Sequence, residues 1–163
     1  MKSAYTSFLR SVLPAVVLAA ASLPAWAGGP PPGNAKELLC PVCGMLSSNY
    51  PKWRTRIFFK GGVISSFDSP TDMFRFLGDM ARYDSKHTEA DVTQIHVTDY
   101  VQRRWIDARH AFYVSGSTAR GPMGDDLPAF ENKANAEFFA RSAGGKVLNF
   151  TQAAKEISGT QAR

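Results

Sequence analysis

The chain has 163 residues, a formal net charge of +5 at pH 7 and 44% hydrophobic residues. This length and apolar content suit one compact domain, or two small modules that share a core. The charges are scattered without a block of Lys and Arg, so the sequence gives little support for nucleic-acid binding. The mild positive excess remains compatible with docking to an acidic partner or an anionic membrane.

The N-terminus has the plan of a secretory signal peptide. Lys2 and Arg10 supply the positive start, an apolar stretch covers 11–23, and Ala25-Trp26-Ala27 is a small-x-small cleavage site. The apolar stretch is short for a membrane span, so an uncleaved anchor is the lesser alternative. No cysteine lies near this site, so no lipoprotein signal is expected. We expect a signal peptide at 1–27, cleavage after Ala27 and a periplasmic protein.

Short strands and helices follow a flexible Gly/Pro-rich leader at 28–37. Lys60-Gly61-Gly62 separates two β-prone runs as a hairpin turn, and Ser69-Pro70 is a helix start. In chain order we expect strands at 53–59 and 63–67, a helix from 70, a loop at 84–91, strands at 95–101, 105–107 and 111–114, a loop at 115–126, a helix at 133–142, a strand at 147–150, a helix at 151–157, and a frayed tail at 159–163.

The order of these elements suggests an internal repeat. Phe67-Asp68 and Phe130-Glu131 each end a strand just before a helix that carries aromatic residues, and a glycine-methionine motif lies upstream of each. We therefore expect an α+β fold of two pseudo-related ββα-type modules, at about 38–90 and 91–158, packed as one compact domain over 38–158.

The strongest chemical signal is Cys40-Pro41-Val42-Cys43-Gly44-Met45. The chain has only two cysteines, and a disulfide between residues three apart closes a loop too small to stabilise the fold much. Two thiolates at this spacing can converge on one ion, and the Met45 thioether adds a third soft donor. Because soft sulfur ligands favour Cu(I), the residues indicate a copper site at Cys40, Cys43 and Met45.

Two other uses of the cysteine pair remain open at this stage. A thiol–disulfide oxidoreductase would place the pair at the start of a helix after a first strand, whereas here a hairpin follows it. A zinc-stabilised module would need further nitrogen or sulfur ligands, and no second C-x-x-C or H-x-x-x-H pattern occurs. An unmetallated pair in the periplasm tends to oxidise, so we expect a Cys40–Cys43 disulfide that blocks metal loading.

Gly121-Pro122-Met123-Gly124 is the second signal, because it repeats a methionine between loop-forming residues. Packing of Met123 onto the sheet is the alternative to a ligand role. Among the histidines, His87 and His96 are expected to face solvent, and His110 is a weak additional metal candidate. No nucleophile, base and acid occur in a catalytic context, so an enzyme is not expected.

With these motifs in hand, the chain resembles the NosL family, the accessory proteins of nitrous oxide reductase. The resemblance covers about 39–157. It is carried by the following stretches: Cys40–Met45, Phe67-Asp68 with Asp72-Met73, 111–117, Gly121–Gly124 and 144–150.

The resemblance implies a periplasmic Cu(I) chaperone that delivers copper to a NosD/NosF/NosY-type complex and, through it, to the copper centres of nitrous oxide reductase. It implies copper ligands among Cys40, Cys43, Met45 and Met123. Many members look like lipoproteins, whereas this chain has Ala25-Trp26-Ala27-Gly28 at that point. We therefore expect a monomer that meets the membrane only through its partner or an uncleaved signal.

Overall fold

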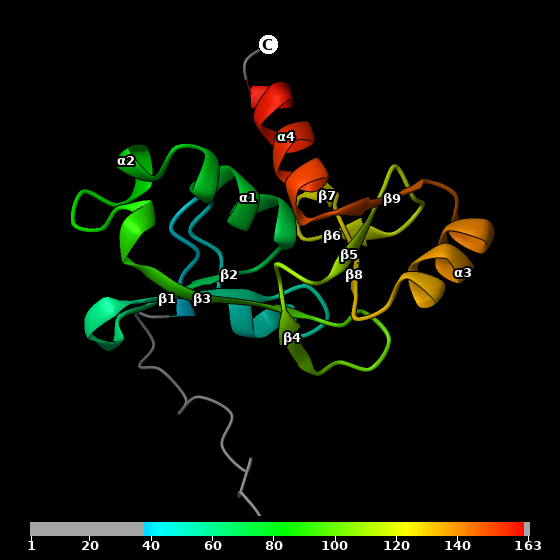
Figure 1. The fold of residues 1–163 in the computed structure, drawn as a ribbon, viewed down its shortest axis with the longest axis horizontal. Coiled ribbons are helices and arrows are strands. Elements are labelled where there is room, and N and C mark those ends of the chain that lie inside the picture. Colours follow the sequence, from blue (N-terminus) through cyan, green and yellow to red (C-terminus); the bar gives the residue numbers. More distant parts are fainter. Residues whose placement is uncertain (1–37, 162–163) are drawn as a thin grey trace, which may run out of the picture. The chain divides into compact units, whose positions relative to one another are not determined.

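The computed structural model describes residues 38–161 of the chain. The signal peptide expected at 1–27, the leader expected at 28–37 and the last two residues lie outside the described residues. The expected α+β fold is confirmed, since antiparallel sheets and helices alternate along the chain (Figure 1).

The first sheet is antiparallel and has the strand order β2-β1-β3-β4. Its strands are β1 (Thr55–Phe59), β2 (Ile64–Phe67), β3 (Val92–Thr98) and β4 (Trp105–Asp107). The turn between β1 and β2 is the 3-10 turn η3 (Lys60–Gly62), where Gly61 and Gly62 both have positive φ, as the hairpin signal predicted. Two further 3-10 turns are η2 (Ser47–Asn49) and η4 (Glu89–Asp91).

Helix α1 (Pro70–Gly78) follows β2 and is capped as the sequence predicted. The Ser69 hydroxyl accepts the backbone N–H of Asp72 at 3.2 Å, and Pro70 occupies the first turn. Its buried face carries Met73, Phe74 and Phe76, and the short helix α2 (Met80–Tyr83) continues from it.

The second sheet has the strand order β8-β5-β9. It contains β5 (Phe112–Ser115), β8 (Ala129–Phe130) and β9 (Lys146–Asn149), followed by α4 (Phe150–Gln161). Helix α3 (Lys133–Ala143) connects β8 to β9, and the Asn132 side chain caps it by accepting the N–H of Asn135 at 2.9 Å.

The two sheets share one topology. In each, the first strand lies between two others, a helix connects those two flanking strands, and the first sheet continues beyond β3 with β4. β1, β2, α1 and β3 thus correspond to β5, β8, α3 and β9, so the expected repeat is present as ββαβ. The third strand of the first sheet, β3, begins just after the expected module boundary at residue 90.

A single apolar core joins the two modules. Phe74 of α1 packs edge-on against Tyr113 of β5, with ring centroids 5.1 Å apart, and also meets Phe150 of α4. The same cluster contains Cys40 and residues of both sheets, which agrees with the expectation of two modules packed as one compact domain.

Three expectations about the elements were wrong. The loop expected at 115–126 contains a hairpin of β6 (Arg120–Gly121) and β7 (Gly124–Asp125), because Pro122 and Met123 form its two-residue turn. β3 spans Val92–Thr98 and not the expected 95–101, because Val92 and Gln94 already pair with β1 and the strand ends at Thr98. α4 continues to Gln161, so 159–161, expected as a frayed tail, are helical.

Between residues 38 and 161, no helix has the length and apolar character needed to cross a membrane.

Candidate metal centre

The cysteines lie on a short loop that precedes the first strand. The loop is closed by two backbone hydrogen bonds, from Cys40 N–H to the Met45 carbonyl and from Gly44 N–H to the Cys40 carbonyl, both at 2.8 Å. An antiparallel bridge between Leu39 and Leu46 lies just outside them. Gly44 has φ +76°, a conformation that side chains with a Cβ rarely adopt, so the glycine lets the chain turn behind the thiols.

Two carboxylates reach the cysteine loop from a different part of the chain. Asp68 directly follows β2, and Asp72 lies in the first turn of α1. Both side chains are fully buried. Since Ser69 and Pro70 start the helix between them, the strand end and the helix start hold the two acids against the same loop.

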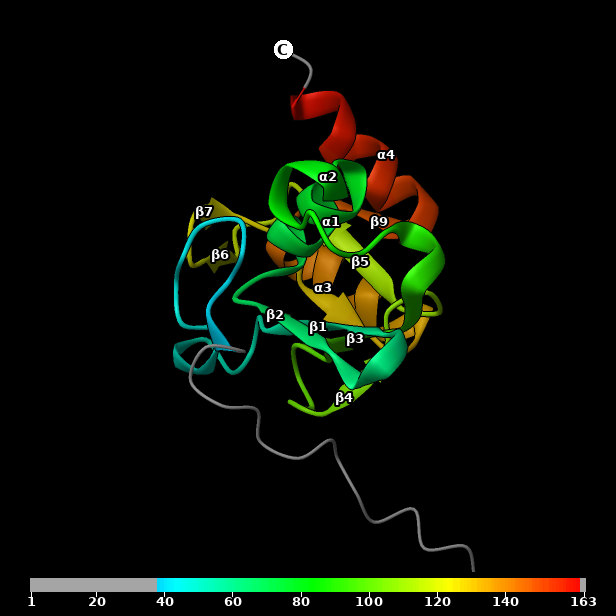
Figure 2. The same cartoon turned by 90° about the vertical axis from the view of Figure 1, so that its left-hand side faces the viewer.

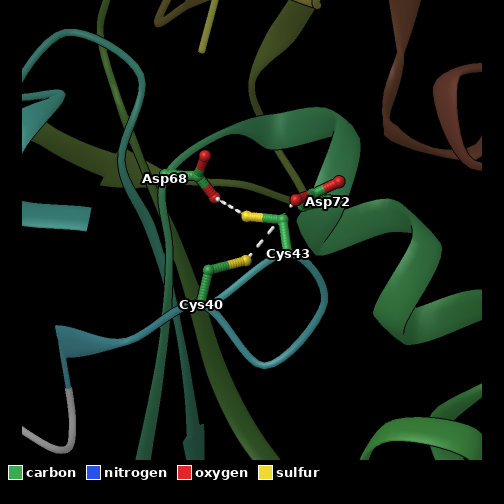
Figure 3. A group of neighbouring side chains, drawn as sticks. All are labelled: Cys40, Cys43, Asp68 and Asp72. Carbon is green, nitrogen blue, oxygen red and sulfur yellow. Dashed lines mark hydrogen bonds between the residues drawn. The ribbon is translucent and has the colours of Figure 1, made fainter. Parts of the chain in front are cut away.

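The two thiols and the two carboxylates point toward one another (Figure 3). The Cys43 Sγ–H donates to Asp68 Oδ1 at 3.1 Å, and the Cys40 Sγ–H donates to Asp72 Oδ2 at 3.5 Å. One ligand atom from each of the four residues lies within 4.8 Å of all the others. Both cysteines are free, so this arrangement can hold one metal ion through two sulfur and two oxygen atoms.

Burial keeps the thiols protonated in the absence of a cation. It raises the pKa of Cys43 to about 12, with hydrogen bonding to Asp68 acting in the same direction. It raises the pKa of Cys40 further. A redox-active C-x-x-C needs a lowered thiol pKa to attack a disulfide, so these thiols are poorly suited to oxidoreductase chemistry.

The carboxylates are compensated only in part. Asp72 Oδ1 accepts the Arg75 guanidinium at 2.8 Å, which balances one buried negative charge. Asp68 Oδ2 is buried and has no hydrogen-bond partner among the described residues. An unsatisfied buried carboxylate oxygen costs free energy, and a cation bound between the thiols and Asp68 would remove that cost.

The structure brings Cys40 and Cys43 together but leaves the two methionine predictions untested. Met45 is half-buried on the loop, and its carbonyl closes the loop. Met123 lies 57% exposed in the turn of the β6–β7 hairpin. In Figure 2 the loop and this hairpin both lie to the left of α1, whereas in Figure 1 they lie on opposite sides of it. Both methionines stay predicted ligands.

The histidines lie outside this cluster. His110 is highly exposed and 3.4 Å from Asp107. His87 was expected to be solvated, and this was wrong: it stacks on Phe59 and bonds to Asp84 at 2.7 Å. His96 faces away from its buried neighbours on β3 as expected, but it is half-buried beside Phe58.

Asp126 ties the β6–β7 hairpin to the helix that carries Asp72. Its Oδ1 accepts the backbone N–H of Thr71 at 3.1 Å, the Thr71 hydroxyl at 2.8 Å and the N–H of Leu127 at 2.8 Å. A Cβ added at Gly121 would lie 2.3 Å from Asp126 Oδ2, so the hairpin backbone packs directly on this carboxylate.

Burial raises the pKa of Asp126 to about 6. The folded chain therefore holds a proton that the unfolded chain has released, and stability should fall as the pH rises from about 4 to about 6. The loss amounts to up to about 3 kcal/mol. Asp126→Asn cannot ionise and should lose this part of the pH dependence in thermal unfolding measured from pH 4 to pH 8. An unchanged pH profile would contradict the raised pKa.

Gly44→Ala should lower the free energy of unfolding by about 1 kcal/mol, because alanine is strained at positive φ. No atom lies within 4 Å of the added Cβ, so metal affinity should change little. Gly159→Ala in α4 also meets no atom, and there it should stabilise by a few tenths of a kcal/mol. Thermal unfolding of both variants tests the opposite signs.

Sequence reasoning missed the two carboxylates as ligands, although it had noted both positions as family markers. Asp68 and Asp72 flank a helix start, four residues apart, and such acids are usually read as capping residues. The signal that distinguishes them is burial next to cysteines 25 and 32 residues away, and this depends on the tertiary fold.

The fold and the site together define a small two-module protein whose paired cysteines and aspartates are placed so that they could hold a metal ion. Comparison with known proteins gives the family. The NosL family model matches residues 34–158, and the chain belongs to the NosL family.

Two relatives support this membership. The copper-binding lipoprotein NosL of Stutzerimonas stutzeri is 31% identical over 121 residues, which cover 69% of this chain and 60% of that protein. The crystal structure of the copper chaperone NosL from Shewanella denitrificans matches with a TM-score of 0.60 and 29% identity, covering 76% of this chain and 96% of that chain. Both are named as copper proteins and not as enzymes, in agreement with the expectation of a copper chaperone.

Proposed function

We propose that this chain is a periplasmic Cu(I) metallochaperone that delivers copper to a NosD/NosF/NosY-type complex for assembly of the copper centres of nitrous oxide reductase. The observation that carries the proposal is the convergence of Cys40 and Cys43 with two buried aspartates, all within 4.8 Å. The names of the two NosL relatives supply the metal by similarity.

The chemistry of the site favours Cu(I) as cargo. Thiolate sulfur is a soft ligand that Cu(I) prefers, and the cluster offers two such atoms on one loop. The thiols must lose their protons when the ion binds, and each already donates a hydrogen bond to its own carboxylate. Asp68 and Asp72 are thus the first acceptors for the released protons.

Transfer needs an approach route for a partner's ligand. Leu39 and Leu46 flank the cysteine loop and are 45% and 40% exposed, although large apolar side chains usually avoid water. Cys43 is less buried than Cys40. A partner surface that covers these leucines would bring its own histidine or methionine to the Cys43 side, and the ion would move by ligand exchange.

A zinc-stabilised module is the second candidate, and one observation favours it. Two thiolates and two carboxylates supply the four ligands of a closed tetrahedral zinc site. The two candidates differ in their response to competing metals. A chaperone should bind Cu(I) in preference to Zn(II) and stay folded without metal, whereas a zinc module should unfold when zinc is chelated.

The test is an anaerobic titration of the chain with Cu(I) against a chromogenic chelator, with and without excess Zn(II). We expect one Cu(I) per chain at a sulfur site, visible by thiolate-to-copper absorption, and passage of that Cu(I) to the purified assembly complex. Weak Cu(I) binding that zinc abolishes would reject the chaperone proposal. Tight binding without passage would reject the partner.

Met45→Ala and Met123→Ala should each weaken Cu(I) binding by about tenfold if both thioethers are ligands. Val101→Ala is the control, because it truncates an apolar side chain that is as exposed as Met123 and lies in the loop between β3 and β4. Chelator competition measures all three. If the two methionine variants bound Cu(I) as tightly as the control, neither methionine would be a ligand, and the cysteine–aspartate cluster alone would form the site.

A further inference from the structure

The cysteine loop, which precedes β1 of the first sheet, has a structural copy ahead of β5, the first strand of the second sheet. In the loop between β3 and β4, Asp99 N–H donates to the Arg104 carbonyl and Arg103 N–H donates to the Asp99 carbonyl, both at 2.8 Å. The same two hydrogen bonds close the Cys40–Met45 loop, and each residue of the second loop has a number 59 higher than its counterpart in the first. The flanking pairs also correspond, since Leu39 bridges Leu46 and Thr98 pairs with Trp105.

The backbone conformation of the two loops agrees as well. Gly44 has φ +76°, and Arg103 at the corresponding position has φ +55°. Arg103 is the one non-glycine residue with positive φ in the part of the chain that the structure describes. A bulky residue held in this strained conformation indicates that the loop shape is fixed by its hydrogen bonds.

The first residue of each loop holds an acceptor in the same cradle of backbone N–H groups. The backbone N–H groups of Val42 and Cys43 act on the Cys40 sulfur and lower its pKa, against the larger effect of burial, which raises it. Asp99 Oδ1 accepts the N–H groups of Val101 and Gln102, the corresponding residues, at 3.0 and 2.8 Å. Cys40 is 2% exposed and Asp99 is fully buried. A carboxylate therefore occupies the position of the first sulfur ligand.

The acid opposite the loop is also repeated. Asp68 follows Phe67 at the end of β2, and Glu131 follows Phe130 at the end of β8. In the first module Asp68 Oδ1 accepts the Cys43 thiol. In the second module Glu131 Oε2 accepts the guanidinium of Arg104, which holds the position of Met45.

We propose that loop 98–105 is a second copy of the metal site in which the Arg104 guanidinium takes the place of the metal ion. Asp99, Gln102 and Arg104 stand where Cys40, Cys43 and Met45 stand, so the soft donors are gone and a fixed positive charge faces the remaining acid. The second module therefore needs no metal ion, because Arg104 supplies the positive charge. Loading and release of an ion act on loop 39–46 alone, and the chain carries one sulfur site.

The correspondence also bears on Met45. The side chain of Arg104 reaches from this loop position to the carboxylate of Glu131. Met45 holds the same position on a loop whose Cys43 contacts Asp68, so the correspondence predicts that its thioether reaches an ion held between Cys43 and Asp68.

The test rebuilds the site in the second module and uses Cu(I) as the probe, a choice that rests on the proposed function. In a Cys40→Ser/Cys43→Ser background, Asp99→Cys, Gln102→Cys and Arg104→Met are introduced together. We expect one Cu(I) per chain, with thiolate-to-copper absorption. The matched control keeps Arg104 with the same two new cysteines, and it should bind at least about tenfold more weakly because the guanidinium repels the cation.

A folded triple variant that binds Cu(I) no better than the background would overturn the proposal, and so would equal affinity with and without Arg104. If the triple variant does not fold, hydrogen exchange on the unmodified chain decides. Cu(I) should slow exchange in loop 39–46 and leave loop 98–105 unchanged, and a comparable change in both loops would overturn the proposal. Because the unmodified chain is titrated separately, its failure to bind Cu(I) would reject the proposed function and not the duplication.

Discussion

Replacing Cys40 and Cys43 together by serine is expected to weaken Cu(I) binding by at least about a thousandfold, equivalent to about 4 kcal/mol. Serine preserves the size of the side chain but offers a hard hydroxyl oxygen in place of soft sulfur. Asp68 and Asp72 remain in the variant, so the residual site is made of oxygen ligands that suit other cations.

The measurement is anaerobic competition with a Cu(I) chelator, and thermal unfolding without metal is the check on folding. Asp72→Asn is the informative control, because it keeps both sulfur atoms and removes one carboxylate that Cys40 and Arg75 contact. Its Cu(I) affinity should fall far less than that of the double serine variant. If the serine variant retained wild-type affinity, the sulfur site would not be the copper site.

The cysteine pair was predictable from the sequence because its chemistry depends on local spacing. A turn of four residues brings Cys40 and Cys43 together whatever the rest of the chain does. Asp68 and Asp72 enter the site through tertiary packing, since α1 must dock on the first sheet before its first turn meets the cysteine loop. No local pattern carries that information, and the two acids also fit an ordinary helix start.

The repeat was visible in part for a related reason. Phe67-Asp68 and Phe130-Glu131 mark corresponding strand ends, and both helix caps follow at once, so the ββα pattern could be recognised. The loop duplication could not, because Asp99 and Arg104 share no chemistry with Cys40 and Met45. Backbone hydrogen bonds preserve the loop shape there, while the side chains differ entirely.

The β6–β7 hairpin and His87 show two other limits. Strands of two residues have no hydrophobic alternation to detect, so only the glycines around Pro122-Met123 hinted at a turn. The polar sequence around His87 suggested a solvated loop, yet the ring packs against Phe59 with centroids 4.5 Å apart. That contact joins residues distant in sequence, which composition cannot reveal.

Asp99→Ala is expected to lower the free energy of unfolding by about 3 kcal/mol, or the melting temperature by roughly 10 °C. The carboxylate is fully buried and accepts three backbone N–H groups, two in its own loop and one from Glu131 at 2.9 Å. Alanine leaves all three donors without that acceptor, and it cuts the link between the β3–β4 loop and the end of β8. Because the loop belongs to the metal-free copy, Cu(I) affinity at Cys40 and Cys43 should be unchanged.

Thermal unfolding of three variants separates this effect from the loss of any surface aspartate. Asp107→Ala removes an exposed carboxylate that accepts one backbone N–H, from Arg109 at 2.7 Å, and should cost at most about 1 kcal/mol. Asp99→Asn keeps the oxygen for the two loop N–H groups and should fall between the two alanine variants. If Asp99→Ala were no less stable than Asp107→Ala, the carboxylate would not hold the second loop in shape. The Asp99 carboxylate would then not play the part in the second loop that the Cys40 sulfur plays in the first.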